Sequence, residues 1–295
     1  MIDMHTHCFP NELAPRALGK TNIYGTYETD ASVGGQLALA HKEHIRKFII
    51  LHTAFRPDSM IHVNDFAVRV NHQENIVISF GSVHPHAPNA IEEVERLYSL
   101  GIRGIKFQPT RQSFYIDEPC CAPIFRRIGE LGMMTTIHGG GSARTKEYPV
   151  LPSALAKCID CFGGATVNFA HMGGMFISDK ERRLAASLPI VTDTALCARH
   201  LTQDEFNRAL DLFGVERVMF GTDMPWASMA VETGYIYNAP ITAAEKEMIF
   251  DGNAARYLME CGAMLPEEES LTEQDLVERY DDLDIPSLLH RDGCG

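Results

Sequence analysis

Eight short runs of apolar and β-forming residues recur along the chain, and each is followed by a turn and a longer segment with helical spacing of its apolar residues. The runs are MIDMHTH (1–7), KFIILHTA (47–54), IVISFGSVHP (76–85), GIRGIKFQP (101–109), MTTIHGG (134–140), ATVNFAHMGG (165–174), PIVTDTA (189–195) and RVMFGTDMPW (217–226). Strict alternation of strand and helix predicts a parallel α/β sheet, and eight repeats favour a closed (β/α)8 TIM barrel over an open doubly wound sheet. An open sheet would carry a glycine-rich phosphate turn after its first strand, and HTHCFPNELAP contains none.

Three helix starts match the capping box, in which a hydroxyl and a carboxylate satisfy each other's free backbone amides. The matches are Ser178-x-x-Glu181, Thr202-x-x-Glu205 and Thr242-x-x-Glu245. After Thr202, the residues Phe206, Leu210 and Phe213 recur at i, i+4 and i+7. This spacing predicts a helix with one apolar face against the sheet.

The repeating pattern stops near residue 265, where an acidic segment, PEEESLTEQDLVERYDDLDIPSLLHRDGCG, begins. We therefore expect one barrel domain over residues 1–265 and a C-terminal extension over 266–295, with a short helix near 270–280. A chain of 295 residues that is 45% hydrophobic is long enough to bury such a core.

The charge and the apolar pattern restrict the partners of the chain. Its formal net charge of −13 argues against nucleic acid or an anionic membrane as the main partner, because both select clusters of Lys and Arg. No apolar run reaches membrane-spanning length and no secretory signal is evident, so we expect a cytoplasmic protein. Eight cysteines without a repeated spacing indicate a reducing compartment, and Cys158-x-x-Cys161 is interpreted as two packing residues on one helix.

Polar, chemically active residues cluster where the predicted strands end. They are His5 and His7 on the first strand, Lys106 on the fourth, His138 on the fifth, His171 on the sixth and Asp223 on the eighth. Because the active site of a parallel barrel lies at the carboxyl ends of its strands, these side chains are expected to meet. Each alone has an ordinary explanation as a surface or hydrogen-bonded residue, but together they offer the nitrogen and oxygen ligands that a divalent ion accepts.

Several motifs extend this pattern: DMHTHCFP, GIKFQP, TIHGG, FAHMGG, FGTDMPW and GNAARYL. Over roughly residues 1–260 the chain resembles the amidohydrolase superfamily, and more narrowly the amidohydrolase-2 branch that holds aminocarboxymuconate-semialdehyde decarboxylase, dihydroxybenzoate decarboxylases and 2-pyrone-4,6-dicarboxylate lactonase. The resemblance implies a metal-dependent TIM-barrel enzyme with one divalent ion. Zinc is the expected ion, and manganese is the alternative.

Carried over residue by residue, the resemblance implies that His5, His7 and His138 bind the metal. Asp223 would be a further ligand or would handle the proton of the metal's water, and His171 would act as an acid, a base or a polarising residue. Lys106 matches a position that carries a metal-bridging carbamylated lysine in binuclear relatives, but here we expect a cationic anchor for a substrate carboxylate.

Other side chains are expected to shape the substrate site. Arg56, Arg111 and Arg144 follow strands on the side where a substrate would enter, and guanidinium groups pair well with carboxylates. Of these, Arg111 is the expected substrate-binding residue. Trp226, directly after the Asp223 motif, is expected to form a wall of the pocket.

We expect hydrolysis of a C–O or C–N bond in a small carboxylate-bearing molecule by a metal-activated water. The leading alternative is a metal-dependent non-oxidative decarboxylase, a carbon–carbon lyase on the same site. A barrel that has lost catalysis and only binds is a further alternative, but the complete set of strand-end residues argues against it. The resemblance also implies that a homodimer can form.

Overall fold

The strands of the chain form the expected barrel, as a computed structural model describing residues 1–19, 26–71, 73–142 and 147–265 shows. The strands are β1 (Ile2–Thr6), β2 (Lys47–Leu51), β3 (Val77–Ser82), β4 (Gly104–Phe107), β5 (Met134–Ile137), β6 (Val167–Phe169), β7 (Thr192–Asp193) and β8 (Val218–Met219). Each lies inside one of the eight predicted runs and is shorter than the run.

Hydrogen bonds carry the parallel sheet around the full ring. Strands β1 to β6 pair in chain order, and β7 pairs with β8. The Phe169 amide donates to the carbonyl of Val191 at 2.9 Å, which joins β6 to the chain that enters β7. The Asp223 amide donates to the carbonyl of His5 at 2.8 Å, which joins the chain after β8 to β1. The prediction of a closed barrel is confirmed.

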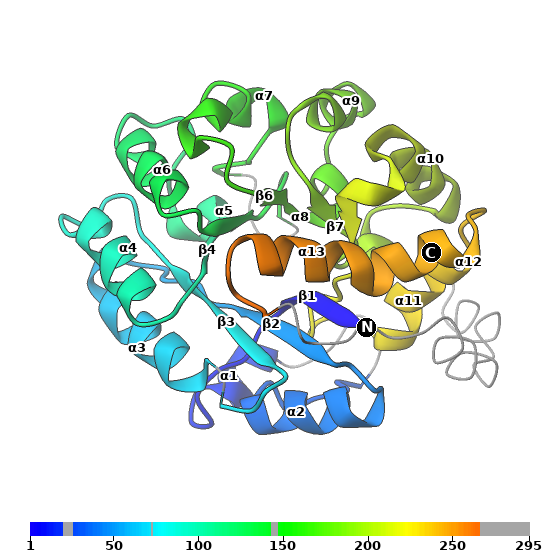
Figure 1. Cartoon of the computed structure of the whole chain (residues 1–295), viewed down its shortest axis with the longest axis horizontal. Coiled ribbons are helices and arrows are strands. Elements are labelled where there is room, and N and C mark those ends of the chain that lie inside the picture. Colours follow the sequence, from blue (N-terminus) through cyan, green and yellow to red (C-terminus); the bar gives the residue numbers. More distant parts are fainter. Residues whose placement is uncertain (20–25, 72, 143–146, 266–295) are drawn as a thin grey trace.

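Helices surround the strands (Figure 1). The α-helices are α1 (Ala14–Leu18), α2 (Val33–Lys42), α3 (Met60–Val70), α4 (Ala90–Ser99), α5 (Pro109–Gln112), α6 (Cys121–Glu130), α7 (Pro152–Leu155), α8 (Ala170–Gly173), α9 (Asp179–Ser187), α10 (Gln203–Phe213), α11 (Met229–Tyr237), α12 (Ala243–Glu247) and α13 (Asn253–Glu260). Short single turns are η1 (Pro57–Ser59), η2 (Ile159–Phe162), η3 (Cys197–Arg199), η4 (Val215–Arg217) and the π-helical η5 (Met248–Gly252). No helix in the described ranges is long and apolar enough to cross a membrane.

Two apolar clusters form the core. The larger lies between strands and helices and includes the predicted stripe of α10, whose Phe206, Leu210 and Phe213 are all buried. The smaller joins side chains of the strands, such as Ile49 and Met219, to Leu258 and its neighbours on α13. In Figure 1, α13 crosses the ring of strands, so this helix closes one end of the barrel.

The closed end is the amino end of the strands. Arg46, directly before β2, donates to both carboxylate oxygens of Asp251 on η5, at 2.8 and 2.7 Å. Asp251 is completely buried. A buried carboxylate needs such a partner, and a two-bond guanidinium fork supplies it.

Two local predictions need correction. Ser178 caps α9 as expected, but Glu181 turns away and its carboxylate instead accepts from the Ser153 amide at 2.9 Å, so the reciprocal half of that box is absent. The capping boxes at Thr202 and Thr242 are complete.

Cys158 and Cys161 do not share one helix, because the chain turns between α7 and η2. The predicted extension, residues 266–295, lies outside the described residues.

Candidate metal and substrate site

A cavity of about 790 Å³ opens at the carboxyl ends of the strands. All eight of the catalytic, metal-binding and substrate-binding residues predicted from the sequence line it: His5, His7, Lys106, Arg111, His138, His171, Asp223 and Trp226. The residues selected at the predicted strand ends therefore share one cavity, because parallel strands deliver every carboxyl end to the same face of the barrel.

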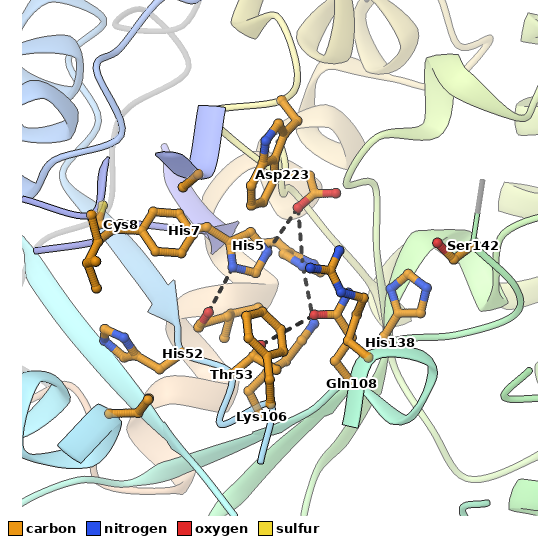
Figure 2. A pocket seen from close by; sticks show the side chains of 18 of the residues that line it. His5, His7, Cys8, His52, Thr53, Lys106, Gln108, His138, Ser142 and Asp223 are labelled. Carbon is orange, nitrogen blue, oxygen red and sulfur yellow. Dashed lines mark hydrogen bonds and ion pairs between the residues drawn. The ribbon is translucent and has the colours of Figure 1, made fainter. Parts of the chain in front are cut away.

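Three of these side chains converge most closely. The Nε2 atoms of His5 and His7 lie 3.7 and 3.0 Å from Oδ1 of Asp223 (Figure 2). All three residues are buried. Two imidazole nitrogens and one carboxylate oxygen at these separations form a donor set for a divalent cation.

The orientation of both imidazoles supports this interpretation. The Nδ1–H of His5 donates to Oδ2 of Asp193 at 2.9 Å, and the Nδ1–H of His7 donates to the carbonyl of Leu51 at 2.8 Å. With Nδ1 protonated in this way, each Nε2 presents a lone pair toward Asp223. Metal-binding histidines are typically held by such a second hydrogen bond.

The charges in this group are also suited to a cation. Burial alone would raise the pKa of Asp223, but the adjacent His7 and His5 hold that pKa well below its usual range. Burial lowers the pKa of His7. The site therefore holds a carboxylate and a neutral imidazole, which are the protonation states in which these groups bind metal.

His138 and His171 form a second buried pair that is short of one proton. Nε2 of His171 lies 2.9 Å from Nδ1 of His138, while their outer nitrogens contact the carbonyls of Ala195 and Gly141 at 2.8 and 3.0 Å. These three contacts need three protons, but two neutral imidazoles carry two. Burial lowers the pKa of both rings, for His171 to about 3, so a third proton is costly. A cation bound to one of these nitrogens would remove the shortage.

Lys106 is buried in the floor of the cavity. Its Nζ lies 3.2 Å from Nε2 of His5. Burial lowers the pKa of this ammonium to about 8, although Asp193 and Asp223 oppose the shift. The lysine thus places a positive charge beside the donor set.

Asp193, at the end of β7, is the central residue that the sequence reasoning missed. Its Oδ2 accepts from His5 and from Nδ2 of Asn168, the latter at 2.7 Å. Its Oδ1 accepts from the His171 amide at 3.0 Å. One carboxylate therefore orients residues from β1, β6 and the turn after β6. The same strand-end rule applied to VTDTA in the seventh run would have found it.

Asp3 connects the two strands that carry the donor set. Its Oδ1 accepts from the amides of His5 and Thr222 at 3.1 and 3.0 Å, and its Oδ2 accepts from the Thr222 hydroxyl at 2.6 Å. Burial raises the pKa of Asp3 to about 7. Next to Thr222, Asp223 has a left-handed backbone with φ of 72°, a strained conformation that these contacts help to hold.

The mouth of the cavity is strongly cationic for so acidic a chain. Arg16, Arg56, Arg111 and Arg199 line it and are exposed, and Asp223 is the only carboxylate among the described lining residues. Arg111 lies over the ring of Phe55, with its guanidinium carbon 4.9 Å from the ring centroid. Arg144, also expected here, lies outside the described residues. The ring of Trp226 lies 5.1 Å from that of His7 and so forms part of the wall.

Comparison with protein families identifies a match over most of the chain. An amidohydrolase family model matches residues 2–258. Comparison with curated proteins gives no match.

Solved structures with the same fold include enzymes that act on aromatic acids. 5-Carboxyvanillate decarboxylase from Sphingomonas paucimobilis is 18% identical, with a TM-score of 0.63 over 88% of this chain and 98% of its own. The 2,6-dihydroxybenzoate decarboxylase from Rhizobium is 14% identical, with a TM-score of 0.67 over 88% and 98%. A dihydroxybenzoic acid decarboxylase from Polaromonas, 15% identical with a TM-score of 0.63 over 88% and 96%, was solved with bound manganese.

Proposed function

Because this chain belongs to the amidohydrolase family, a family of metal-dependent enzymes, we propose that it hydrolyses a C–O or C–N bond of a small carboxylate-bearing molecule. The observation that carries the proposal is the buried Asp223 carboxylate, which lies against the imidazoles of His5 and His7 in the cavity. A carboxylate in this state can accept a proton from water.

We assign His5, His7 and Asp223 as ligands of one divalent ion, with His138 as a further ligand. The assignment of His138 is supported by the proton shortage of its pair with His171. A bound divalent ion supplies a water of lowered pKa and polarises a carbonyl oxygen. Zinc suits three imidazoles and a carboxylate, and manganese is the alternative, since a structural relative binds it.

Proton transfer falls to Asp223 in this proposal. Its carboxylate takes the proton from the attacking water and passes it to the leaving oxygen or nitrogen. His171 donates its Nδ1–H to the carbonyl of Ala195, so its Nε2, which lies 2.9 Å from Nδ1 of His138, accepts a proton rather than donating one in the neutral state. We therefore assign His171 as an acid–base partner at the rim of the same group.

Recognition of the substrate falls to the cationic residues. Lys106 would pair with a carboxylate near the donor set, and Arg111 would pair with one at the mouth, where its guanidinium is already stacked on Phe55. The wall formed by Trp226 would pack against the carbon skeleton.

Decarboxylation is the second candidate, and the named structural relatives favour it. In that reaction Asp223 would first take up a proton from solvent and then deliver it to the carbon that carries the carboxylate, while carbon dioxide leaves. The cationic mouth suits either reaction, because both start from a carboxylate.

One experiment separates the two reactions. The metal-loaded protein is incubated in 18O-labelled water with panels of lactones, amides and hydroxybenzoates, and the products are examined by mass spectrometry. Hydrolysis predicts one 18O atom in the product and no carbon dioxide. Release of carbon dioxide from a substrate without label in the organic product would establish decarboxylation and overturn the leading proposal.

A further inference from the structure

A second group of metal-ligand side chains lies outside the cavity. Nε2 of His86 is 2.6 Å from Oε2 of Glu118, and the Sγ of Cys120 is 3.8 Å from the same oxygen. The ligand atoms of all three residues lie within 4.8 Å of one another. None of the three lines the catalytic cavity. We propose that His86, Glu118 and Cys120 form a separate site for a thiophilic divalent cation such as zinc.

The separations suit a four-coordinate ion. With bonds of about 2.0–2.3 Å, tetrahedral zinc holds its ligand atoms about 3.3–3.8 Å apart. The contact between Glu118 and Cys120 already lies at that distance, and the contact between His86 and Glu118 needs to widen by less than about 1.2 Å. His86 and Cys120 are exposed, so these side chains are free to make that movement and water can supply the fourth ligand.

The backbone holds the two loops that carry the ligands. Oε1 of Glu118 accepts from the Tyr115 amide at 2.7 Å, which leaves Oε2 directed at His86. The His86 amide lies 3.3 Å from Nδ1 of His84, which shapes the loop after β3. Oε1 thus fixes the orientation of the Glu118 carboxylate, and Oε2 is left to bind the cation. Metal ligands are typically held by such a supporting hydrogen bond.

The ligand types also select the cation. A thiolate with an imidazole and a carboxylate favours zinc over magnesium or calcium, which prefer oxygen ligands alone. Binding would release the thiol proton of Cys120 to solvent and join the loop after β3 to the segment before α6. An ordinary surface ion pair between His86 and Glu118 would require no thiol, and this difference makes the proposal testable.

Cobalt(II) is a suitable probe, because a cobalt–thiolate bond gives a near-ultraviolet charge-transfer band that nitrogen and oxygen ligands do not give. The full chain, stripped of metal and kept reduced with a phosphine, is titrated with cobalt(II). We expect the band in the natural protein and in His5→Ala, which disrupts only the catalytic cavity. We expect Cys120→Ser to lose the band and one equivalent of bound zinc, and His86→Ala to bind this cation at least about 10-fold more weakly.

Two variants serve as matched controls. His41→Ala removes a surface histidine that pairs with Glu74 at 3.4 Å without a thiol in the group, and Cys161→Ser removes another partly exposed thiol. Both should keep the band, and Cys120→Ser should keep the catalytic activity. Persistence of the band in Cys120→Ser, or its absence from the natural protein under saturating cobalt(II), would refute the site.

Discussion

The two ends of the barrel differ in whether their buried charged groups satisfy one another. At the amino end, Arg46 and Asp251 satisfy each other through two hydrogen bonds, and α13 covers the strands with apolar side chains. At the carboxyl end, Asp223 faces the imidazoles of His5 and His7, Lys106 faces the same His5 nitrogen, and His138 and His171 share too few protons. The first arrangement is complete without a ligand, and the second is completed only by one. Stability and activity should therefore depend on different ends.

The largest effect should come from the carboxyl end. His5→Ala removes one nitrogen from the donor set, so bound metal and catalytic activity should fall to background. Asp193 keeps its bonds from Asn168 and from the His171 amide, so the fold should survive. Metal analysis of the dialysed protein, together with circular dichroism, checks this. A variant that retains one tightly bound ion and full activity would contradict the metal assignment.

Asp251→Ala tests the opposite end. It leaves the Arg46 guanidinium largely buried without its carboxylate, which should lower the free energy of unfolding by about 3–5 kcal/mol. The activity per folded molecule should stay unchanged, because Asp251 does not line the cavity. Urea unfolding and kcat/KM measured well below the transition test both expectations. A large fall in kcat/KM of the folded protein would show that the ends are coupled.

Asp193→Asn should give a smaller effect on function. The variant keeps the shape of the residue but weakens its hold on the Nδ1–H of His5, so metal affinity should fall about 10–100-fold. Competition with a chromogenic chelator measures this affinity. Asn168→Asp is not a suitable control, because it would place two carboxylates together. Thr135→Ser is the better control, because its buried hydroxyl has no hydrogen-bond partner among the described residues, and it should leave the affinity unchanged.

Arg111→Ala probes the mouth of the cavity. Loss of a guanidinium that pairs with a substrate carboxylate should raise KM about 10-fold and leave metal content unaltered. Arg69→Ala is the matched control, because Arg69 also stacks on a phenylalanine but does not line the cavity. Equal KM values for both variants would show that Arg111 does not bind the substrate.

The smallest effect is expected from the helix that leads into the closed end. Thr242→Ala removes the N-cap of α12 and should cost about 1 kcal/mol of stability without changing activity. Hydrogen bonds from Thr242 lower the pKa of Glu245 below 4.5. The capping box of Thr242 and Glu245 therefore stabilises the natural protein above pH 4.5, the ordinary pKa of Glu245. This stabilisation is lost as the pH falls through the lowered pKa. The difference between the thermal melts of the two proteins should narrow in acid, and a constant difference would contradict a contribution from the Glu245 carboxylate.

Most of the barrel and the cavity could be predicted from the sequence. The apolar runs mark each strand locally, and closure of a parallel barrel brings the carboxyl ends of all the strands to one face. His5 and Asp223 lie 218 positions apart, yet His5 lies in β1 and Asp223 follows β8, and parallel closure brings the two together. The role of α13 could not be predicted in the same way. Its apolar face looks like that of any outer helix, and only the tertiary arrangement places it under the strands.

The hydrogen-bond partners of individual side chains were the least predictable feature of the structure. Ser178 and Glu181 match the capping box as well as Thr202 and Glu205 do, but Glu181 finds a competing amide at Ser153. The place of Asp193 at the end of the seventh run was a signal, but no neighbouring residue in the sequence shows what its carboxylate binds. Its importance comes from Asn168 and His5, which reach it from other strands.

The closure of the amino end also governs how the chain can fold as it leaves the ribosome. Strand β1 is made first, but its hydrogen-bonded neighbour after β8 and the α13 side chains that cover Ile2 and Met4 are made more than 200 residues later. Contacts of such long range form slowly and leave apolar strands exposed in the meantime. Until α13 emerges, we expect the nascent barrel to depend on chaperones, and chains truncated before residue 253 to aggregate rather than fold.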